Sequence, residues 1–191
     1  LMLKNALLRP PIIDHRIHSL PIETAHEIQH RLLSSLNNSN PALYNVASSV
    51  IAAVAVNKDG LQPHFHVSNW TIISNLVETP STGSLLTLSK LLLDGIDEIP
   101  ISQLDYAIPV LIQLLFNDAH TNTHTNVLKC LMHCVPRMPS ALIAHLDEYI
   151  SSLSRLSEVP QLRTTVIQSL TAILEVHCAF LEEHSTAIVR F

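Results

Sequence analysis

Apolar residues recur along the chain at spacings of three and four, which is the periodicity of an amphipathic helix. The pattern is clearest in residues 87–100, 126–139 and 165–178, which superpose without gaps at a spacing of 39 residues. Three apolar columns, four residues apart, hold Leu88, Val127 and Val166, then Leu92, Leu131 and Leu170, then Ile96, Val135 and Leu174. Each segment is therefore predicted to be a helix with one buried stripe.

The helices between these segments follow the same spacing less regularly. It aligns Leu111 with Ile150 and Val189, but it also places Ile108 opposite Asp147. Two helices per repeat of about 39 residues predict an all-α fold, an α-solenoid of HEAT or armadillo-type helical hairpins with roughly four to five repeats. We expect residues 1–191 to form a single continuous array, because each hairpin buries its stripe only against its neighbours.

The expected helix boundaries follow from proline and turn residues. A first helix is predicted to end near Pro10 and Pro11, because proline lacks the amide donor that a helix interior needs. Pro41, Pro100 and Pro139 lie at or just before helix starts, where a missing donor costs little. Further helices are predicted over residues 21–36, 41–57, 65–78, 82–97, 101–116, 122–135, 140–156, 161–176 and 179–191.

Composition supports helices and narrows the classes of function. Hydrophobic residues make up 47% of the 191 residues, but aromatic residues only 4%, so the apolar side chains are mostly aliphatic and suit helix packing. The three glycines form no phosphate-binding loop of either familiar pattern. The net charge is −5 and the basic residues are scattered, which disfavours direct binding to nucleic acid.

The cellular setting is predicted from what the sequence lacks. Three cysteines, two of them within one helical turn, do not suggest a disulfide framework, so a reducing compartment is expected. The sequence has no apolar run long enough to cross a bilayer and no signal-peptide pattern, so a soluble intracellular protein is predicted. The chain opens and stops within helical patterns, so a C-terminal fragment of a longer solenoid protein is expected.

A cluster of possible metal ligands lies in NVLKCLMHCVPRMP, residues 126–139. Cys130, His133 and Cys134 would lie on neighbouring parts of one helix surface. Zinc usually takes four ligands, often as two spaced pairs, and this segment offers one pair. Free cysteine commonly packs as a small hydrophobe, and both cysteines border the apolar stripe, so packing is the favoured interpretation and no cofactor is predicted.

The letters HEIQH match the HExxH pattern of zinc hydrolases through His26, Glu27 and His30. Such an enzyme also needs a third ligand and a substrate cleft, whereas this segment fits an amphipathic solenoid helix. A zinc hydrolase therefore remains an alternative of another class, and the chain is predicted not to be an enzyme.

A mostly polar row beside the apolar stripe is the preferred candidate for binding. Its members, again 39 residues apart, are Thr87, Asn126 and Thr165, then Lys90, Lys129 and Gln168, then Asp94 and His133. We expect these positions to lie off the core. Because the second helices of HEAT-type arrays line the concave side, this row is predicted to contact a partner, and an ordinary solvated face is the alternative.

The stretch from about residue 85 to 191 resembles the C-terminal HEAT repeats of the large adaptor subunit of the cytosolic iron-sulfur protein assembly (CIA) targeting complex. The segments that carry the resemblance are LLDGIDEIPISQLDYAIPVLIQLLF, LKCLMHCVPRMPSALIAHLDEYISSLSRL and RTTVIQSLTAILEVHCAFLEEHSTAIVRF. In each, a leucine-rich helix leads through a short proline or polar turn into the next. Residues 12–80 are similar to the family more loosely.

The resemblance implies a binding role. In that family the C-terminal region docks a small scaffold subunit, which binds a WD-repeat propeller subunit, and the assembly delivers iron-sulfur clusters to apoproteins. These clients include DNA helicases, polymerases and repair factors, so a link to nucleotide excision repair and transcription would be indirect. The expected location is the cytoplasm and the nucleus. A HEAT-repeat transport receptor or another assembly scaffold is the alternative within the same architecture.

Overall fold

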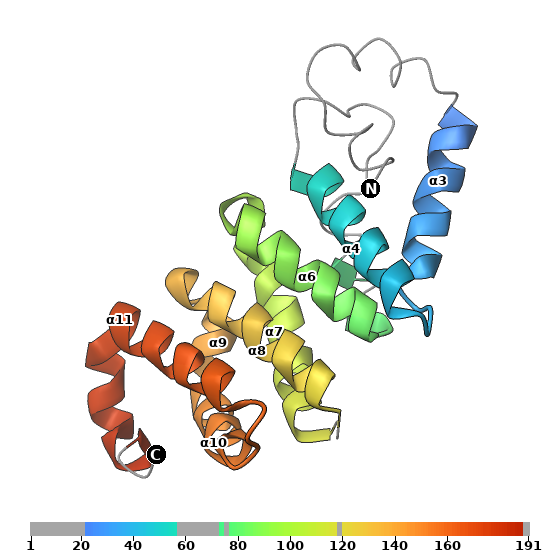
Figure 1. The fold of residues 1–191 in the computed structure, drawn as a ribbon. Coiled ribbons are helices and arrows are strands. Elements are labelled where there is room, and N and C mark those ends of the chain that lie inside the picture. The colour runs from blue at the N-terminus through green and yellow to red at the C-terminus, as the bar shows by residue number, and fades with distance from the viewer. Residues whose placement is uncertain (1–21, 57–72, 75–76, 118–119, 189–191) are drawn as a thin grey trace. The chain divides into compact units, whose positions relative to one another are not determined.

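The computed structural model describes residues 22–56, 73–74, 77–117 and 120–188, and every regular element in them is helical (Figure 1). The predicted all-α class is therefore confirmed for this part of the chain. The helix expected to end near Pro10 lies outside the described residues, and so does most of the one expected over 65–78. The chain divides into two compact units, Leu1–Gly95 and Ile96–Phe191, each of which is described separately. The single continuous array stays a prediction.

The described part of the first unit contains helices α3 (Ile22–Ser35), α4 (Pro41–Val56) and α6 (Thr82–Gly95). In α3 and α4 the observed bounds lie close to the predicted ones. The turn before α4 is closed by asparagine, because Asn40 Oδ1 accepts a 3.0 Å hydrogen bond from the Ala42 amide. Ser81 caps α6 in the same way, with Oγ 3.1 Å from the Ser84 amide that donates to it. The helix start expected at 82 is thus confirmed, and the Ser81 cap accounts for it.

Helices α4 and α6 pack closely in this unit (Figure 1), and Gly83 makes that approach possible. A Cβ atom on Gly83 would lie 2.3 Å from the carbonyl oxygen of Leu36 and 2.9 Å from Tyr44 Cβ. Across the same contact, the buried Ser48 hydroxyl donates a 3.1 Å hydrogen bond to the Gly83 carbonyl. A residue without a side chain is therefore required at this crossing.

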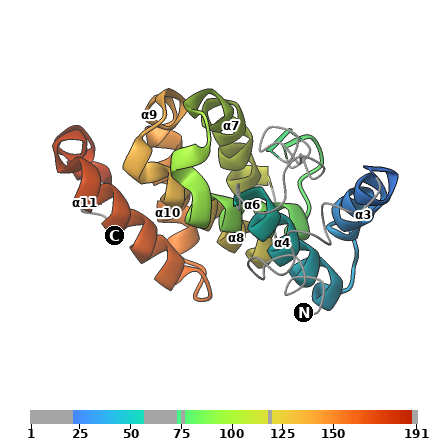
Figure 2. The ribbon, with the colours of Figure 1, turned by 90° about the horizontal axis from the view of Figure 1, so that it is seen from above.

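The second unit contains two pairs of helices. In chain order its elements are η1 (Ile96–Glu98), α7 (Ile101–Asn117), α8 (Thr121–Cys134), η2 (Val135–Arg137), α9 (Ser140–Ala144), α10 (Leu146–Ser157) and α11 (Arg163–Ile188). Helix α7 packs on α8, and α10 packs on α11. Between the pairs, α8 packs on α11 while α7 packs on α9 and α10, as Figure 2 shows for α7 and α9. Equivalent helices are thus neighbours.

Burial tests the predicted spacing within the second unit. For the second helix of each pair the spacing of 39 holds on one side, where buried Val127 and Cys130 are matched by buried Val166 and Ser169. The predicted buried stripe is wrong for the end of α11, since Leu131 and Val135 are buried while Leu170 is half-buried and Leu174 is 45% exposed. For the first helix it does not hold, since Leu104 is buried while Ile143 is exposed. A spacing of 38 instead pairs five large buried residues of α7 with five of α9 and α10, namely Leu104 with Leu142, Ile108 with Leu146, Leu111 with Tyr149, Ile112 with Ile150 and Leu115 with Leu153. The connection between the helices absorbs the one-residue difference.

Three expected helices differ from the observed ones. The segment 140–156 is divided into α9 and α10 at His145, which has φ −109° and ψ 19° and so leaves the helical region. The segments 161–176 and 179–191 were predicted to be separate, but α11 runs without a break from Arg163 to Ile188. This boundary was wrong because residues 163–188 include no glycine or proline that would end a helix.

Candidate interaction surface

The predicted polar row is partly buried. Thr87, Asn126 and Thr165 are all buried, so the expectation that they lie off the core is wrong. Thr87 shows the physical reason, because its hydroxyl donates a 2.8 Å hydrogen bond to the Gly83 carbonyl one turn earlier in its own helix. A threonine satisfied in this way can be buried at little cost. These three residues contribute to packing and cannot contact a partner.

The remaining members of the row lie at the surface, in two units that are considered separately. In the first unit Asp94 is exposed, whereas Lys90 is half-buried and its Nζ donates a 2.7 Å hydrogen bond to Ser49 Oγ on α4. In the second unit Lys129 and Gln168 are exposed and His133 is half-buried. The accessible part of the row in the second unit is therefore Lys129 and His133 on α8 with Gln168 on α11.

The two cysteines of the same helix are in the core. Cys130 and Cys134 are free thiols that are almost fully buried. Burial raises the pKa of the Cys130 thiol well above its ordinary value, and the neighbouring Cys134 raises it further. Burial also raises the pKa of Cys134 to about 12, although the charge of Arg137 opposes the shift. Both thiols are buried in the apolar core and keep their protons there, so they pack as small hydrophobic side chains.

Tyr149 of α10 lies in the same buried region as the thiols. Its side chain is fully buried. Burial raises the pKa of its hydroxyl well above the ordinary value, the nearby Ser169 hydroxyl lowers it, and the two thiols raise it again. The protonated tyrosine and thiols thus form a neutral, weakly polar part of the core between α8, α10 and α11.

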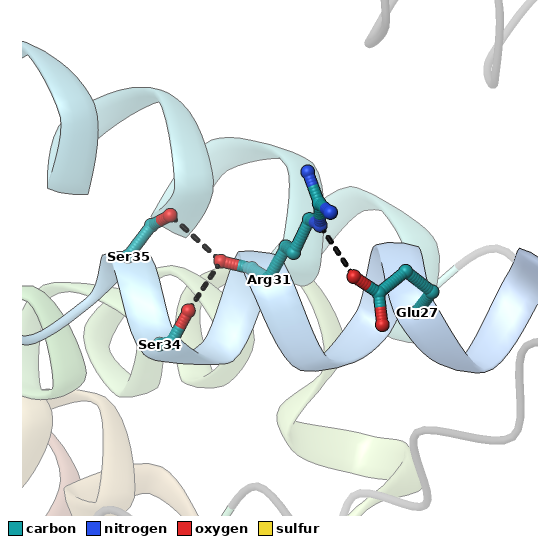
Figure 3. Close-up of polar contacts among 4 residues, drawn as sticks. All are labelled: Glu27, Arg31, Ser34 and Ser35. Atoms are coloured by element: carbon teal, nitrogen blue, oxygen red, sulfur yellow. Dashed lines mark hydrogen bonds and ion pairs between the residues drawn. The ribbon is translucent and has the colours of Figure 1, made fainter.

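The HEIQH segment lies on α3, and its Glu27 carboxylate forms an ion pair with Arg31. Figure 3 shows Glu27 and Arg31 one turn apart on α3. Arg31 Nε donates a 2.6 Å hydrogen bond to Glu27 Oε1. The hydrogen bond from Arg31, followed by its charge, lowers the pKa of Glu27. A general base for hydrolysis needs a raised pKa, so this contact makes Glu27 less suited to that role.

Metal ligands do not gather around this carboxylate either. Within the described residues, no group of three or more His, Cys, Asp or Glu side chains is placed to hold a metal ion. His26 and His30 are exposed on α3. The geometry therefore offers no support for the zinc hydrolase alternative.

Polar contacts between the helix pairs were missed at the sequence level. Asp105 of α7 accepts hydrogen bonds from Ser140 Oγ at 3.0 Å and from the Ala141 amide at 2.8 Å, so it caps α9. Arg155 of α10 donates to the Leu115 carbonyl near the end of α7, and its guanidinium lies 5.2 Å from the centre of the Phe116 ring. These contacts join the two pairs. No local sequence pattern predicts them, because the residues that form each contact lie far apart in the chain.

Another arginine, Arg137, joins the two ends of the α7–α8 pair. Arg137 of η2 donates through Nη1 to the carbonyl oxygens of Ile96 at 2.6 Å and Ile99 at 2.5 Å. The Ile96 carbonyl, at the start of η1, also accepts a 3.3 Å hydrogen bond from the Ile99 amide, whereas the Ile99 carbonyl lies just after the end of η1, where carbonyls lack partners within the helix. The entry into α7 is thereby tied to the exit from α8.

Over the described part of the chain, none of the helices combines the length and apolar composition needed to cross a membrane. In comparisons with known proteins, no protein-family model matches the chain, and no curated protein matches it at a significant level. Function is therefore inferred from the geometry and from the sequence resemblance described above.

Proposed function

We propose that this chain is a non-catalytic protein-protein interaction scaffold with the architecture of a HEAT-type α-solenoid. The observation that carries the proposal is the stacking of two equivalent helix pairs in the second unit, α7 with α8 and α10 with α11. Solenoids of this kind expose a long surface made by equivalent helices, and that surface usually binds other proteins. The thiols are buried and Glu27 is paired with Arg31, so neither offers a reactive group, which agrees with a role in binding.

The polar contacts between the pairs support the same proposal. Asp105 and Arg155 use their charges to satisfy a helix start and a carbonyl of the neighbouring pair instead of presenting them to a substrate. Such contacts fix how one hairpin lies on the next. A scaffold depends on that fixed relation because a partner that contacts several repeats binds best to a preorganised surface.

We further propose that the chain serves as the adaptor of the CIA targeting complex, on the basis of the resemblance over residues 85–191. Its partners would be the small scaffold subunit and the WD-repeat propeller subunit, and the clients would be iron-sulfur apoproteins of DNA metabolism. The sites of action would be the cytoplasm and the nucleus. Lys129, His133 and Gln168 are the accessible residues of the second unit that we assign to the partner surface.

A pull-down from cell extract with quantitative mass spectrometry tests this assignment. The wild-type chain is compared with a Lys129→Glu, Gln168→Glu variant, and we expect the variant to lose the scaffold and propeller subunits that the wild type recovers. Gln113→Glu changes an exposed glutamine of α7, outside the row, and serves as the control. Equal recovery by all three proteins would place the interface elsewhere, and recovery by none would refute the assignment to this complex.

A further inference from the structure

Met138 lies in the connection between the two helix pairs and has a left-handed backbone. Its φ is 38° and its ψ is 64°, and among the residues that the structure describes it alone combines a side chain with a positive φ. Glycine adopts this conformation readily at the end of a helix, but a Cβ atom makes it unfavourable. Pro139 follows, and a residue before proline favours an extended backbone. Met138 is therefore held in a strained conformation.

Contacts on both sides of Met138 hold it in this conformation. Before it, Arg137 Nη1 donates hydrogen bonds of 2.6 Å and 2.5 Å to two backbone carbonyls between α6 and α7. After it, Ser140 Oγ and the Ala141 amide donate hydrogen bonds of 3.0 Å and 2.8 Å to the carboxylate of Asp105 in α7. The chain is thus fixed to the α7 segment on both sides of Met138, so it must turn in the short stretch between these contacts.

Helix α9 is separate from the helices on either side of it. It has five residues, Ser140–Ala144, and begins two residues after Met138. It ends at His145, whose φ of −109° and ψ of 19° interrupt the helix before α10. Hinges are usually a few residues at the ends of elements, where the backbone can change without unfolding a helix. Met138 and His145 are placed to act as such a pair of hinges.

The burial of α9 is slight in comparison with that of α8. Helix α9 packs on α7, but Leu142 is its one buried residue, at 0% exposure. Ser140, Ile143 and Ala144 are exposed. Helix α8, in contrast, buries eight residues. Elements with few buried apolar contacts open at a lower free energy than the core, so α9 is suited to local opening.

We propose that α9 is a strained strap on α7, which opens by backbone rotation at Met138 and His145 while α8, α10 and α11 stay folded. The strain at Met138 favours opening, whereas the contacts of Arg137, Asp105 and Leu142 oppose it. The inference goes beyond the proposed function, because it concerns a motion of this chain alone and needs no partner. A scaffold with such a strap can change its surface between two helix pairs without losing its core.

Amide hydrogen exchange, followed by NMR on the isotopically labelled 191-residue chain, tests the proposal. The reporters are the amides of Leu142, Ile143 and His145, which donate hydrogen bonds to the carbonyls of residues 139 and 141. We expect their protection factors to be at least about tenfold lower than those of Leu131 and Cys134 in α8, because α9 opens without α8.

Met138→Gly distinguishes backbone strain from loose packing. Glycine adopts the left-handed backbone without the Cβ penalty, so the closed state gains and the α9 protection factors should rise about tenfold. In an unstrained connection the same change adds backbone freedom and lowers protection. Met138→Ala is the matched control, because it removes the same side chain beyond Cβ but keeps the strain, so it should not raise the protection of α9.

Arg137→Met tests the contact before the hinge, since it keeps the aliphatic stem and removes the donors. The protection of α9 should fall about tenfold, the effect of losing a charged hydrogen bond, and Met138→Gly in the same chain should restore most of it. Equal protection of α9 and α8 in the wild type would overturn the proposal, because α9 would then open only with the whole unit. A Met138→Gly chain no better protected in α9 than Met138→Ala would also overturn it.

Discussion

The carboxylate of Asp105 in α7 accepts a 2.8 Å hydrogen bond from the backbone amide of Ala141, at the start of α9. A side chain in one helix pair thus caps the first helix of the next pair. The amide groups in the first turn of a helix have no partners within the helix itself. The contact with Asp105 therefore gives the Ala141 amide a hydrogen-bond partner that it would otherwise lack.

Asp105→Ala is expected to lower the free energy of unfolding by about 0.5–2 kcal/mol, the usual cost of a lost helix cap. Urea denaturation followed by circular dichroism measures it. Asp97→Ala, at an exposed aspartate of η1, is the control and should change stability by less than about 0.5 kcal/mol. Equal losses in the two variants would show that the cap does not join the pairs.

Leu131→Ala tests the assignment of the buried column. Leu131 is 0% exposed in α8, so we expect a loss of roughly 2–5 kcal/mol in the free energy of unfolding. Leu174→Ala removes the same atoms from an exposed position of α11 and should cost less than about 0.5 kcal/mol. Similar losses of stability at the two sites would mean that the assignment of Leu131 to the buried column is incorrect.

Gly83→Ala is expected to destabilise the first unit, although the same change usually stabilises a helix by about 0.5–1 kcal/mol. The new Cβ would lie 2.3 Å from the Leu36 carbonyl oxygen in the turn before α4 and 2.9 Å from Tyr44 Cβ in α4, so α6 would have to move away from both. Overpacking of this kind typically costs about 1–3 kcal/mol. Thermal denaturation shows whether the variant is less or more stable than the wild type. A higher melting temperature for the variant would exclude the close approach of Gly83 to Leu36 and Tyr44.

The stability of the second unit should fall at alkaline pH. The folded-state pKa of Cys134 is about 12, above its ordinary value of 9.0, so this thiol keeps its proton longer in the folded state than in the unfolded state. Its contribution is therefore complete below about pH 9 and is lost progressively as pH rises toward 12. Cys130 and Tyr149 shift in the same direction and add to the effect.

Urea denaturation at pH 7, 9 and 10.5 measures this dependence. For the wild type we expect the free energy of unfolding to decrease between the two higher pH values. For Cys134→Ala we expect a smaller decrease over the same interval. Comparison of slopes removes the separate cost of the cavity that alanine leaves. A slope that is unchanged by the substitution would contradict the burial of this thiol.

Proline and capping residues made several helix boundaries predictable from sequence. Pro41 begins α4 as expected, and Ser81 caps α6 at the predicted place. The continuous α11 was missed because a helix boundary was inferred from repeat spacing, where the residues themselves contain no signal to stop. Local chemistry was the better guide to where a helix ends.

The binding row was only partly predictable, because residue type is a weak guide to burial for small hydroxyl residues. Thr87 is polar, yet its hydroxyl bonds within its own helix and the residue is buried. Lys129 and Gln168 are long and polar, and they are exposed as expected. The contact of Asp105 with Ala141 could not be predicted, since it depends on how two hairpins stack.

We propose that this chain binds the CIA scaffold and propeller subunits, and size-exclusion chromatography with light scattering tests that binding. The purified 191-residue chain is mixed with the two purified subunits at equal concentrations. The proposal predicts a single peak that contains all three proteins, with a mass equal to their sum. Separate elution of this chain under conditions where the two subunits bind each other would contradict it.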